Sequence, residues 1–131
     1  MPSAHWTGSA RPETVAFLRE TVADFLIANG IADSHMTDVR LAVSEAVTNA
    51  VVHAFRGRTQ TGTISVSVTL DDDSVEVVVR DDGSGMAPRE DSPGIGLGLP
   101  LIRRVADEFD HREPPGGGSE LWMRFALPRS P

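Results

Sequence analysis

The chain has 131 residues, of which 40% are hydrophobic and 24% are charged, a composition typical of a globular protein rather than a disordered one. Its length predicts a single domain spanning residues 1–131. The net charge of −7 argues against direct binding of nucleic acid, and the lack of lysine and cysteine excludes a P-loop, Schiff-base chemistry and a thiolate nucleophile.

Two amphipathic helices are predicted in the first half of the chain. Apolar residues recur at steps of three and four over residues 12–29, and Gly30 follows as a candidate C-cap. A second helix is predicted from a cap at Thr37 to about Phe55, because a broad apolar stripe runs along it.

The second predicted helix carries two polar residues, Glu45 and Asn49, on the side away from its thickest apolar stripe. They are four residues apart, so their side chains lie one above the other. This arrangement is typical of a solvated helix surface. It is also compatible with a binding site, because an amide oxygen suits a hard cation such as Mg²⁺.

Alternating apolar residues next predict an antiparallel hairpin with strands over residues 64–70 and 75–81. The hairpin leads into Asp81-Asp82-Gly83-Ser84-Gly85, whose two glycines leave space for a flat ligand near the backbone. An ordinary turn would have a similar sequence. The segment that follows, residues 86–95, has no periodicity, and we interpret it as a lid over a site.

A third helix is predicted from near Gly98 through Phe109, followed by a PPGGG break and a last strand, SELWMRFAL. Glycines at positions 94, 96 and 98 expose backbone amides at the start of this helix, where its dipole favours a phosphate. A dinucleotide-binding fingerprint is disfavoured, because it would need a strand directly before the glycines.

Three stretches occur in an order that is more specific than any of them alone. LAVSEAVTNAVVHAF, DDGSGM and GIGLGLPLIRRVADEFD resemble the N, G1 and G2 boxes of the anti-sigma regulatory factors, which are serine/threonine protein kinases of the Bergerat-type, histidine-kinase-like ATPase superfamily. The resemblance covers residues 11–127. It implies an α+β fold, a two-layer α/β sandwich in which three helices cover one face of a mostly antiparallel sheet.

The resemblance also assigns roles to residues. It implies that Glu45 is the general base or orients the attacking group, that Asn49 is the magnesium ligand, and that Asp81 accepts a hydrogen bond from the exocyclic amine of adenine. Ser119 stands where the family usually has a threonine that supports this aspartate. The full set of expected nucleotide-binding residues is Asn49, Asp81, Gly83, Gly85, Met86, Gly94, Gly96, Leu97, Gly98 and Ser119.

By the same resemblance, the protein is expected to use ATP and Mg²⁺, to bind a sigma factor, and to phosphorylate an anti-anti-sigma protein of the STAS type. A homodimer is also implied. One residue departs from the family pattern, because Gly94 stands where well-studied members have an arginine that reaches the transferred phosphate. The alternative is therefore an ATP-binding, partner-switching module with little or no kinase activity.

The first residues show no charged lead followed by an apolar run, and no apolar stretch is long enough to span a bilayer. We therefore expect a cytoplasmic protein that makes no membrane contact.

Overall fold

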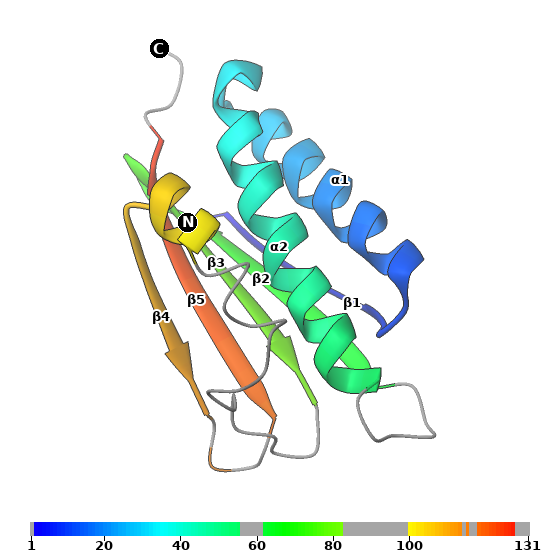
Figure 1. The fold of residues 1–131 in the computed structure, drawn as a ribbon. Coiled ribbons are helices and arrows are strands. Elements are labelled where there is room, and N and C mark those ends of the chain that lie inside the picture. Colours follow the sequence, from blue (N-terminus) through cyan, green and yellow to red (C-terminus); the bar gives the residue numbers. More distant parts are fainter. Residues whose placement is uncertain (1, 56–61, 83–99, 114, 116–117, 128–131) are drawn as a thin grey trace.

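The computed structural model describes residues 2–55, 62–82, 100–113, 115 and 118–127, which form a layer of helices against a sheet (Figure 1). The helical elements are α1 (Pro12–Ala28), the 3₁₀ helix η1 (Asp33–His35), α2 (Met36–Phe55) and a helical segment at residues 100–105. The strands are β1 (Ser3–Ser9), β2 (Thr63–Leu70), β3 (Ser74–Asp81), β4 (Glu108–Arg112) and β5 (Ser119–Ala126).

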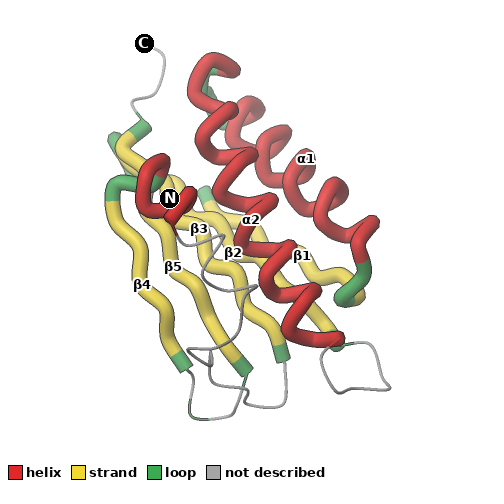
Figure 2. Tube along the Cα trace, in the orientation of Figure 1, coloured by secondary structure: helices red, strands yellow, loops and turns green. Residues whose placement is uncertain are grey.

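Within the described residues, the five strands form one sheet in the order β1-β2-β3-β5-β4, and every neighbouring pair is antiparallel. The helices lie on one face of this sheet, and the other face is left uncovered by them (Figure 2). The predicted α+β sandwich is therefore confirmed, and so is the hairpin, which pairs β2 with β3.

The core lies between the two layers. Alternate residues of β2, β3 and β5 point toward the helices and are buried, as the period of two along a strand requires. The apolar stripes of α1 and α2 cover them. The largest fully buried side chains include Phe125, Leu18, Leu26, Met36, Ile64, Leu70, Ile102 and Met123.

The first helix ends as the sequence indicates. Its last residue is Ala28, and Gly30 then adopts a φ of 95°, a left-handed conformation that suits glycine. The amide of Gly30 donates to the carbonyl of Ile27, and that of Ile31 donates to the carbonyl of Leu26. These bonds satisfy carbonyls that the end of a helix leaves without a partner.

Two predicted boundaries are wrong. Thr37 does not cap the second helix, because η1 leads directly into α2 at Met36 and places Thr37 inside the helix. The third helix does not reach Phe109. It ends at Val105, and Phe109 belongs to β4, where its half-buried ring packs against the core.

Two edge strands were not predicted. β1 pairs with β2 along its whole length, and its Trp6 packs edge-on against Phe25 of α1 with ring centroids 5.6 Å apart. β4 pairs with β5 at the opposite edge. Neither strand has the apolar alternation by which β2 and β3 are recognised.

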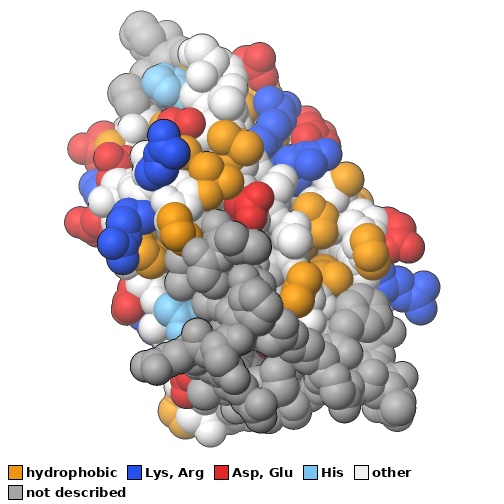
Figure 3. All heavy atoms as spheres, viewed as in Figure 1, with side chains coloured by type: hydrophobic (Ala, Val, Ile, Leu, Met, Phe, Trp, Pro, Cys, Tyr) orange, Lys and Arg blue, Asp and Glu red, His pale blue; other side chains and the backbone are white. Residues whose placement is uncertain are grey.

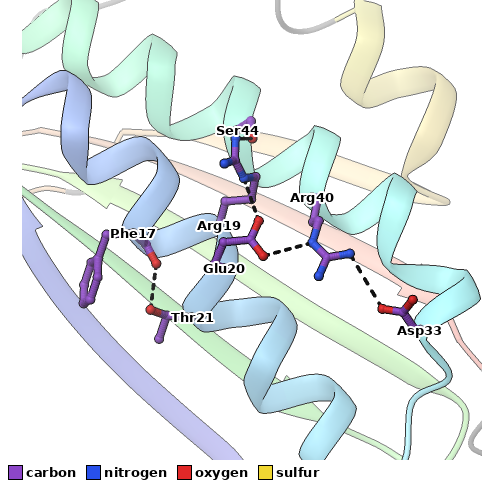
Figure 4. Close-up of polar contacts among 7 residues, drawn as sticks. All are labelled: Phe17, Arg19, Glu20, Thr21, Asp33, Arg40 and Ser44. Carbon is purple, nitrogen blue, oxygen red and sulfur yellow. Dashed lines mark hydrogen bonds and ion pairs between the residues drawn. The ribbon is translucent and has the colours of Figure 1, made fainter.

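Polar side chains join α1 to α2 on the side away from the sheet (Figure 4). The Glu20 carboxylate accepts from Nε of Arg19 at 2.9 Å and from Nε of Arg40 at 3.3 Å. Nη1 of Arg40 also lies 3.8 Å from Oδ1 of Asp33. The hydrogen bond from Arg19, helped by the charge of Arg40, lowers the pKa of Glu20 despite some desolvation.

A shallow hollow between the two helices is lined by Arg19, Glu20 and Arg40, together with Thr37, Leu41 and Ser44. On the same helix layer, apolar side chains lie among charged ones in the space-filling view (Figure 3). The large apolar side chains that stay exposed among the described residues are Phe17, Ile27, Leu41 and Val52. No described helix is long and apolar enough to cross a membrane.

Candidate functional site

The best-defined feature of the predicted site is the carboxylate of Asp81. Asp81 is the last residue of β3 and faces the helix layer, because it follows the buried Val77 and Val79 at alternate positions. Its exposure is only 7%. The hydroxyl of Ser119 donates to Oδ2 of Asp81 over 2.5 Å. A carboxylate is therefore held, nearly buried, at the end of a strand.

Ser119 reaches Asp81 because the two residues are cross-strand partners. β5 starts at Ser119, and the register of the β3–β5 pair places it opposite Asp81. Residues 38 positions apart in the chain thus meet on the inner face of the sheet. The contact expected from the resemblance is present, although the role of either residue in binding a nucleotide stays a prediction.

Gly118 brings the start of β5 close to the same aspartate. Its φ is 82°, and a Cβ added to it would lie 2.2 Å from the carbonyl oxygen of Asp81. No side chain fits at that separation, so only glycine permits this approach. Gly118 is not among the site residues predicted from the sequence. The signal was present in the three glycines that directly precede the last strand.

Asp82 fixes the chain as it leaves β3. Its amide donates to the carbonyl of Thr63 at 3.2 Å, and its carboxylate Oδ1 accepts from the amide of Thr63 at 2.8 Å. Both backbone groups at the start of β2 are thereby paired with one residue. This two-point contact defines where the β2–β3 pair ends.

Glu45 and Asn49 lie on successive turns of α2 and are both half-buried. Their neighbours Ala46, Val47 and Ala50 are buried in the core, so the two polar residues border the apolar stripe. α2 packs against β3, and the C-terminal ends of α2 and β3 lie at the same end of the molecule (Figures 1 and 2). The fold therefore places Glu45 and Asn49 on the element that covers the strand of Asp81.

The remaining predicted site residues lie outside the described part of the chain. This applies to the interpretation of residues 86–95 as a lid and to the departure at Gly94. They stay predictions from the sequence. The residues concerned are Gly83, Gly85, Met86, Gly94, Gly96, Leu97 and Gly98.

The donor set of the described residues fits a purine nucleotide and a magnesium ion. A carboxylate accepts from an exocyclic amine, and its burial strengthens such a hydrogen bond. The side-chain oxygen of Asn49 suits Mg²⁺, which takes few protein ligands and completes its shell with phosphate oxygens and water. No group of three or more His, Cys, Asp and Glu side chains within the described residues is arranged to hold a metal. The described residues therefore do not form a metal site made of His, Cys, Asp and Glu side chains alone.

The antiparallel sheet covered on one face by helices is the architecture expected of a histidine-kinase-like ATPase. The chain belongs to the histidine kinase-like ATPase domain family, whose model matches residues 8–125. The family expected from the three motif stretches is confirmed.

Curated relatives are similar over nearly the whole chain. The anti-sigma F factor of Bacillus velezensis is 35% identical, with 96% of this chain and 93% of that protein aligned. The anti-sigma F factor of Geobacillus stearothermophilus is 30% identical, with 93% and 90% aligned. The expected resemblance to anti-sigma regulatory factors is thus confirmed at the level of sequence.

Two solved structures share the fold. The structure of the RsbU and RsbW domains of Rv1364c from Mycobacterium tuberculosis superposes with a TM-score of 0.76 and 25% identity. It covers 99% of this chain, which spans 34% of that longer chain. The catalytic domain of the histidine kinase ThkA, at 15% identity, covers 96% of both chains with a TM-score of 0.58 and bears on the fold alone.

Proposed function

We propose that this protein is an ATP-dependent anti-sigma factor that binds a sigma factor and phosphorylates a serine or threonine of an anti-anti-sigma protein of the STAS type. The observation that carries the proposal is the buried Asp81 carboxylate held by Ser119, in a chain aligned almost end to end with anti-sigma F factors. The charge of −7 suits a protein partner better than direct contact with nucleic acid.

In this proposal Asp81 selects the nucleotide. Its carboxylate accepts a hydrogen bond from the exocyclic amine of adenine, and Ser119 holds the acceptor oxygen in place. Because Asp81 is 7% exposed, water competes weakly for the carboxylate. The expected glycines of the G1 and G2 boxes, from Gly83 to Gly98, would complete the base pocket and surround the phosphates.

Glu45 and Asn49 serve the chemical step. ATP with Mg²⁺ supplies the phosphoryl group: the bond from the γ-phosphorus to the bridging oxygen of ADP breaks as the bond to the acceptor hydroxyl oxygen forms. Asn49 would hold the metal through its amide oxygen. Glu45, one helical turn away, orients the hydroxyl and accepts its proton.

A second candidate function is favoured by Gly94, which stands where well-studied family members have an arginine. Loss of an arginine that stabilises a transferring phosphoryl group costs about 10³–10⁵ in rate. The protein would then bind ATP and switch partners with little or no phosphoryl transfer. Nucleotide would act by holding the partner-binding conformation.

The proposed kinase is tested by incubating the protein with γ-labelled ATP, Mg²⁺ and a purified STAS-type protein from the same genome. Wild type should label the STAS protein, whereas Glu45→Ala should not, and Thr48→Ala, on the exposed side of the same helix, should label it like wild type. Labelling that survives in Glu45→Ala would contradict the assigned role. Tight ATP binding without any labelling would favour the second candidate.

We further propose that the protein works in the cytoplasm and as a homodimer. Both statements follow from its resemblance to anti-sigma factors. Sedimentation of the purified protein with and without ATP would test the dimer, since a monomer in both conditions would contradict it.

A further inference from the structure

A second carboxylate, half-buried, lies on the opposite side of the sheet from the proposed site. Glu120 is on the uncovered face, yet its side chain is only 12% exposed. Oε2 of Glu120 accepts from both Nε and Nη2 of Arg80, with the Nε bond at 3.0 Å. Its other oxygen lies 3.9 Å from Nη1 of Arg112. None of these residues has a part in the proposed function.

The ion pair is adjacent to the nucleotide-binding aspartate. The register pairs Arg80 with Glu120 and, one residue further, Asp81 with Ser119. Because side chains alternate between faces, the two pairs hold the same end of β3 and β5 from opposite sides of the sheet. Gly118 adds a third contact, since its backbone approaches the Asp81 carbonyl too closely for any side chain.

Arg112 supports the arrangement from β4. It pairs with Asp110 at 2.9 Å, and its guanidinium lies 5.5 Å from the ring centroid of Trp122. Glu120 thus links Arg80 of β3 to Arg112 of β4 across β5. Removing it would leave Arg80 without the partner that ties the end of β3 to β5.

We propose that Glu120 and Gly118 are positioning residues that set the place of the Asp81 carboxylate and thereby the preference of the site for an adenine base. The proposal rests on the proposed function, because it needs Asp81 to receive the base. A hydrogen bond weakens steeply as its distance and angle depart from the optimum. A small displacement of the strand end therefore weakens the hydrogen bond between Asp81 and the amine more than it weakens the contacts of the phosphates.

Inosine triphosphate separates this effect from a general loss of stability. Its base has a carbonyl oxygen where adenine has the amine, so it lacks the exocyclic N–H that is proposed to donate to Asp81, while its ribose and phosphates are those of ATP. A merely structural defect weakens ATP and inosine triphosphate by the same factor. A displaced Asp81 weakens the binding of ATP alone. The dissociation constant of inosine triphosphate divided by that of ATP then falls.

The chain offers a matched control on the same two strands. Glu76 of β3 lies opposite Arg124 of β5 on the same uncovered face, near the other end of the pair. Glu76→Ala removes a carboxylate from this face but leaves the end of β3 at Asp81 untouched. Its ratio of dissociation constants should equal that of wild type.

The test is titration calorimetry of wild type, Glu120→Ala, Gly118→Ala and Glu76→Ala with each nucleotide, after circular dichroism has established folding. Wild type should prefer ATP by about tenfold or more. In Glu120→Ala, and in Gly118→Ala if it folds, this preference should fall by about threefold or more. If Glu120→Ala leaves the ratio of the two dissociation constants unchanged, whether or not both nucleotides bind more weakly, the inference about Glu120 is overturned and the base contact of Asp81 is not. Wild type that binds neither nucleotide, or both equally, overturns the base contact of Asp81 and this inference with it.

Discussion

The hydroxyl of Ser119 donates a 2.5 Å hydrogen bond to the carboxylate of Asp81, and the two residues are cross-strand partners at the end of the β3–β5 pair. The bond uses one lone pair of Oδ2 and fixes the orientation of the carboxylate. Since Asp81 is 7% exposed, water has little access to that oxygen and replaces the Ser119 hydroxyl poorly as a donor. The orientation of the proposed base acceptor therefore depends on the first residue of β5.

Ser119→Ala should weaken ATP binding. A hydrogen bond to a charged group contributes about 1.5–3 kcal/mol, and about 1.4 kcal/mol corresponds to tenfold in affinity, so we expect the dissociation constant to rise roughly tenfold. Ser119→Thr keeps the hydroxyl and should bind ATP nearly as wild type does. Calorimetry decides, and equal affinity of the alanine variant and wild type would contradict the role of Ser119.

Asn49→Ala should remove the dependence of ATP binding on Mg²⁺. Wild type should bind ATP more tightly with Mg²⁺ than with a chelator, because the amide oxygen of Asn49 is the proposed protein ligand. The variant should show the same affinity in both conditions. Thr48→Ala, which removes an exposed side chain from the adjacent position of α2, is the control. A magnesium effect of wild-type size in Asn49→Ala would exclude Asn49 as the ligand.

Leu26→Ala should destabilise the fold strongly, because Leu26 is fully buried between α1 and the sheet. Truncation of a buried leucine costs about 2–5 kcal/mol through lost burial and the cavity left behind. The adjacent Ile27 is 39% exposed, and Ile27→Ala should change stability far less. Urea unfolding followed by circular dichroism compares the two. Similar losses in both variants would show that α1 does not cover the sheet in this orientation.

Glu20 should make stability depend on pH in the acidic range. The hydrogen bond from Arg19, with the charge of Arg40, lowers the pKa of Glu20 below its ordinary value of 4.5. A carboxyl group whose pKa is lower in the folded state contributes stability that is present above the unfolded pKa and is lost as the pH falls through the folded pKa. The contribution is small because the side chain is 48% exposed.

The comparison is the difference in urea midpoint between wild type and Glu20→Gln. Wild type should be slightly more stable at neutral pH, and the difference should shrink as the pH falls through the lowered pKa of Glu20 and vanish once Glu20 is protonated in both states. A difference that stays constant as the pH is lowered below the ordinary pKa of a glutamate would mean that Glu20 acts through packing and not through its charge.

Strong periodicity made α1, α2, β2, β3 and β5 predictable. The apolar residues of β2 and β3 alternate strictly, and those of α1 recur at helical steps before Gly30. β1 and β4 were missed because SAHWTGS and EFDHR contain few apolar residues, and both strands exist through pairing with a neighbour. Phe109 was placed in a helix because its spacing from Val105 continues a helical period.

The sequence predicts the proposed site as a set of residue types, and it does not predict how these residues are arranged. The resemblance named Asp81 and Ser119, yet only the register of β3 with β5 brings them together. No local pattern indicates register between strands so far apart in the chain. The same register explains Gly118, whose backbone conformation and closeness to Asp81 a run of glycines does not reveal. Thr37 failed as a cap because the 3₁₀ turn of η1 begins the helix at Met36.

Titration calorimetry of wild type beside Asp81→Asn tests whether Asp81 binds the adenine of ATP. Asparagine keeps the size of the side chain and removes its charge. Wild type should bind ATP with Mg²⁺, and Asp81→Asn, verified to be folded, should bind it at least about tenfold more weakly. Equal binding by both proteins, or no binding by folded wild type, would exclude this contact between Asp81 and adenine.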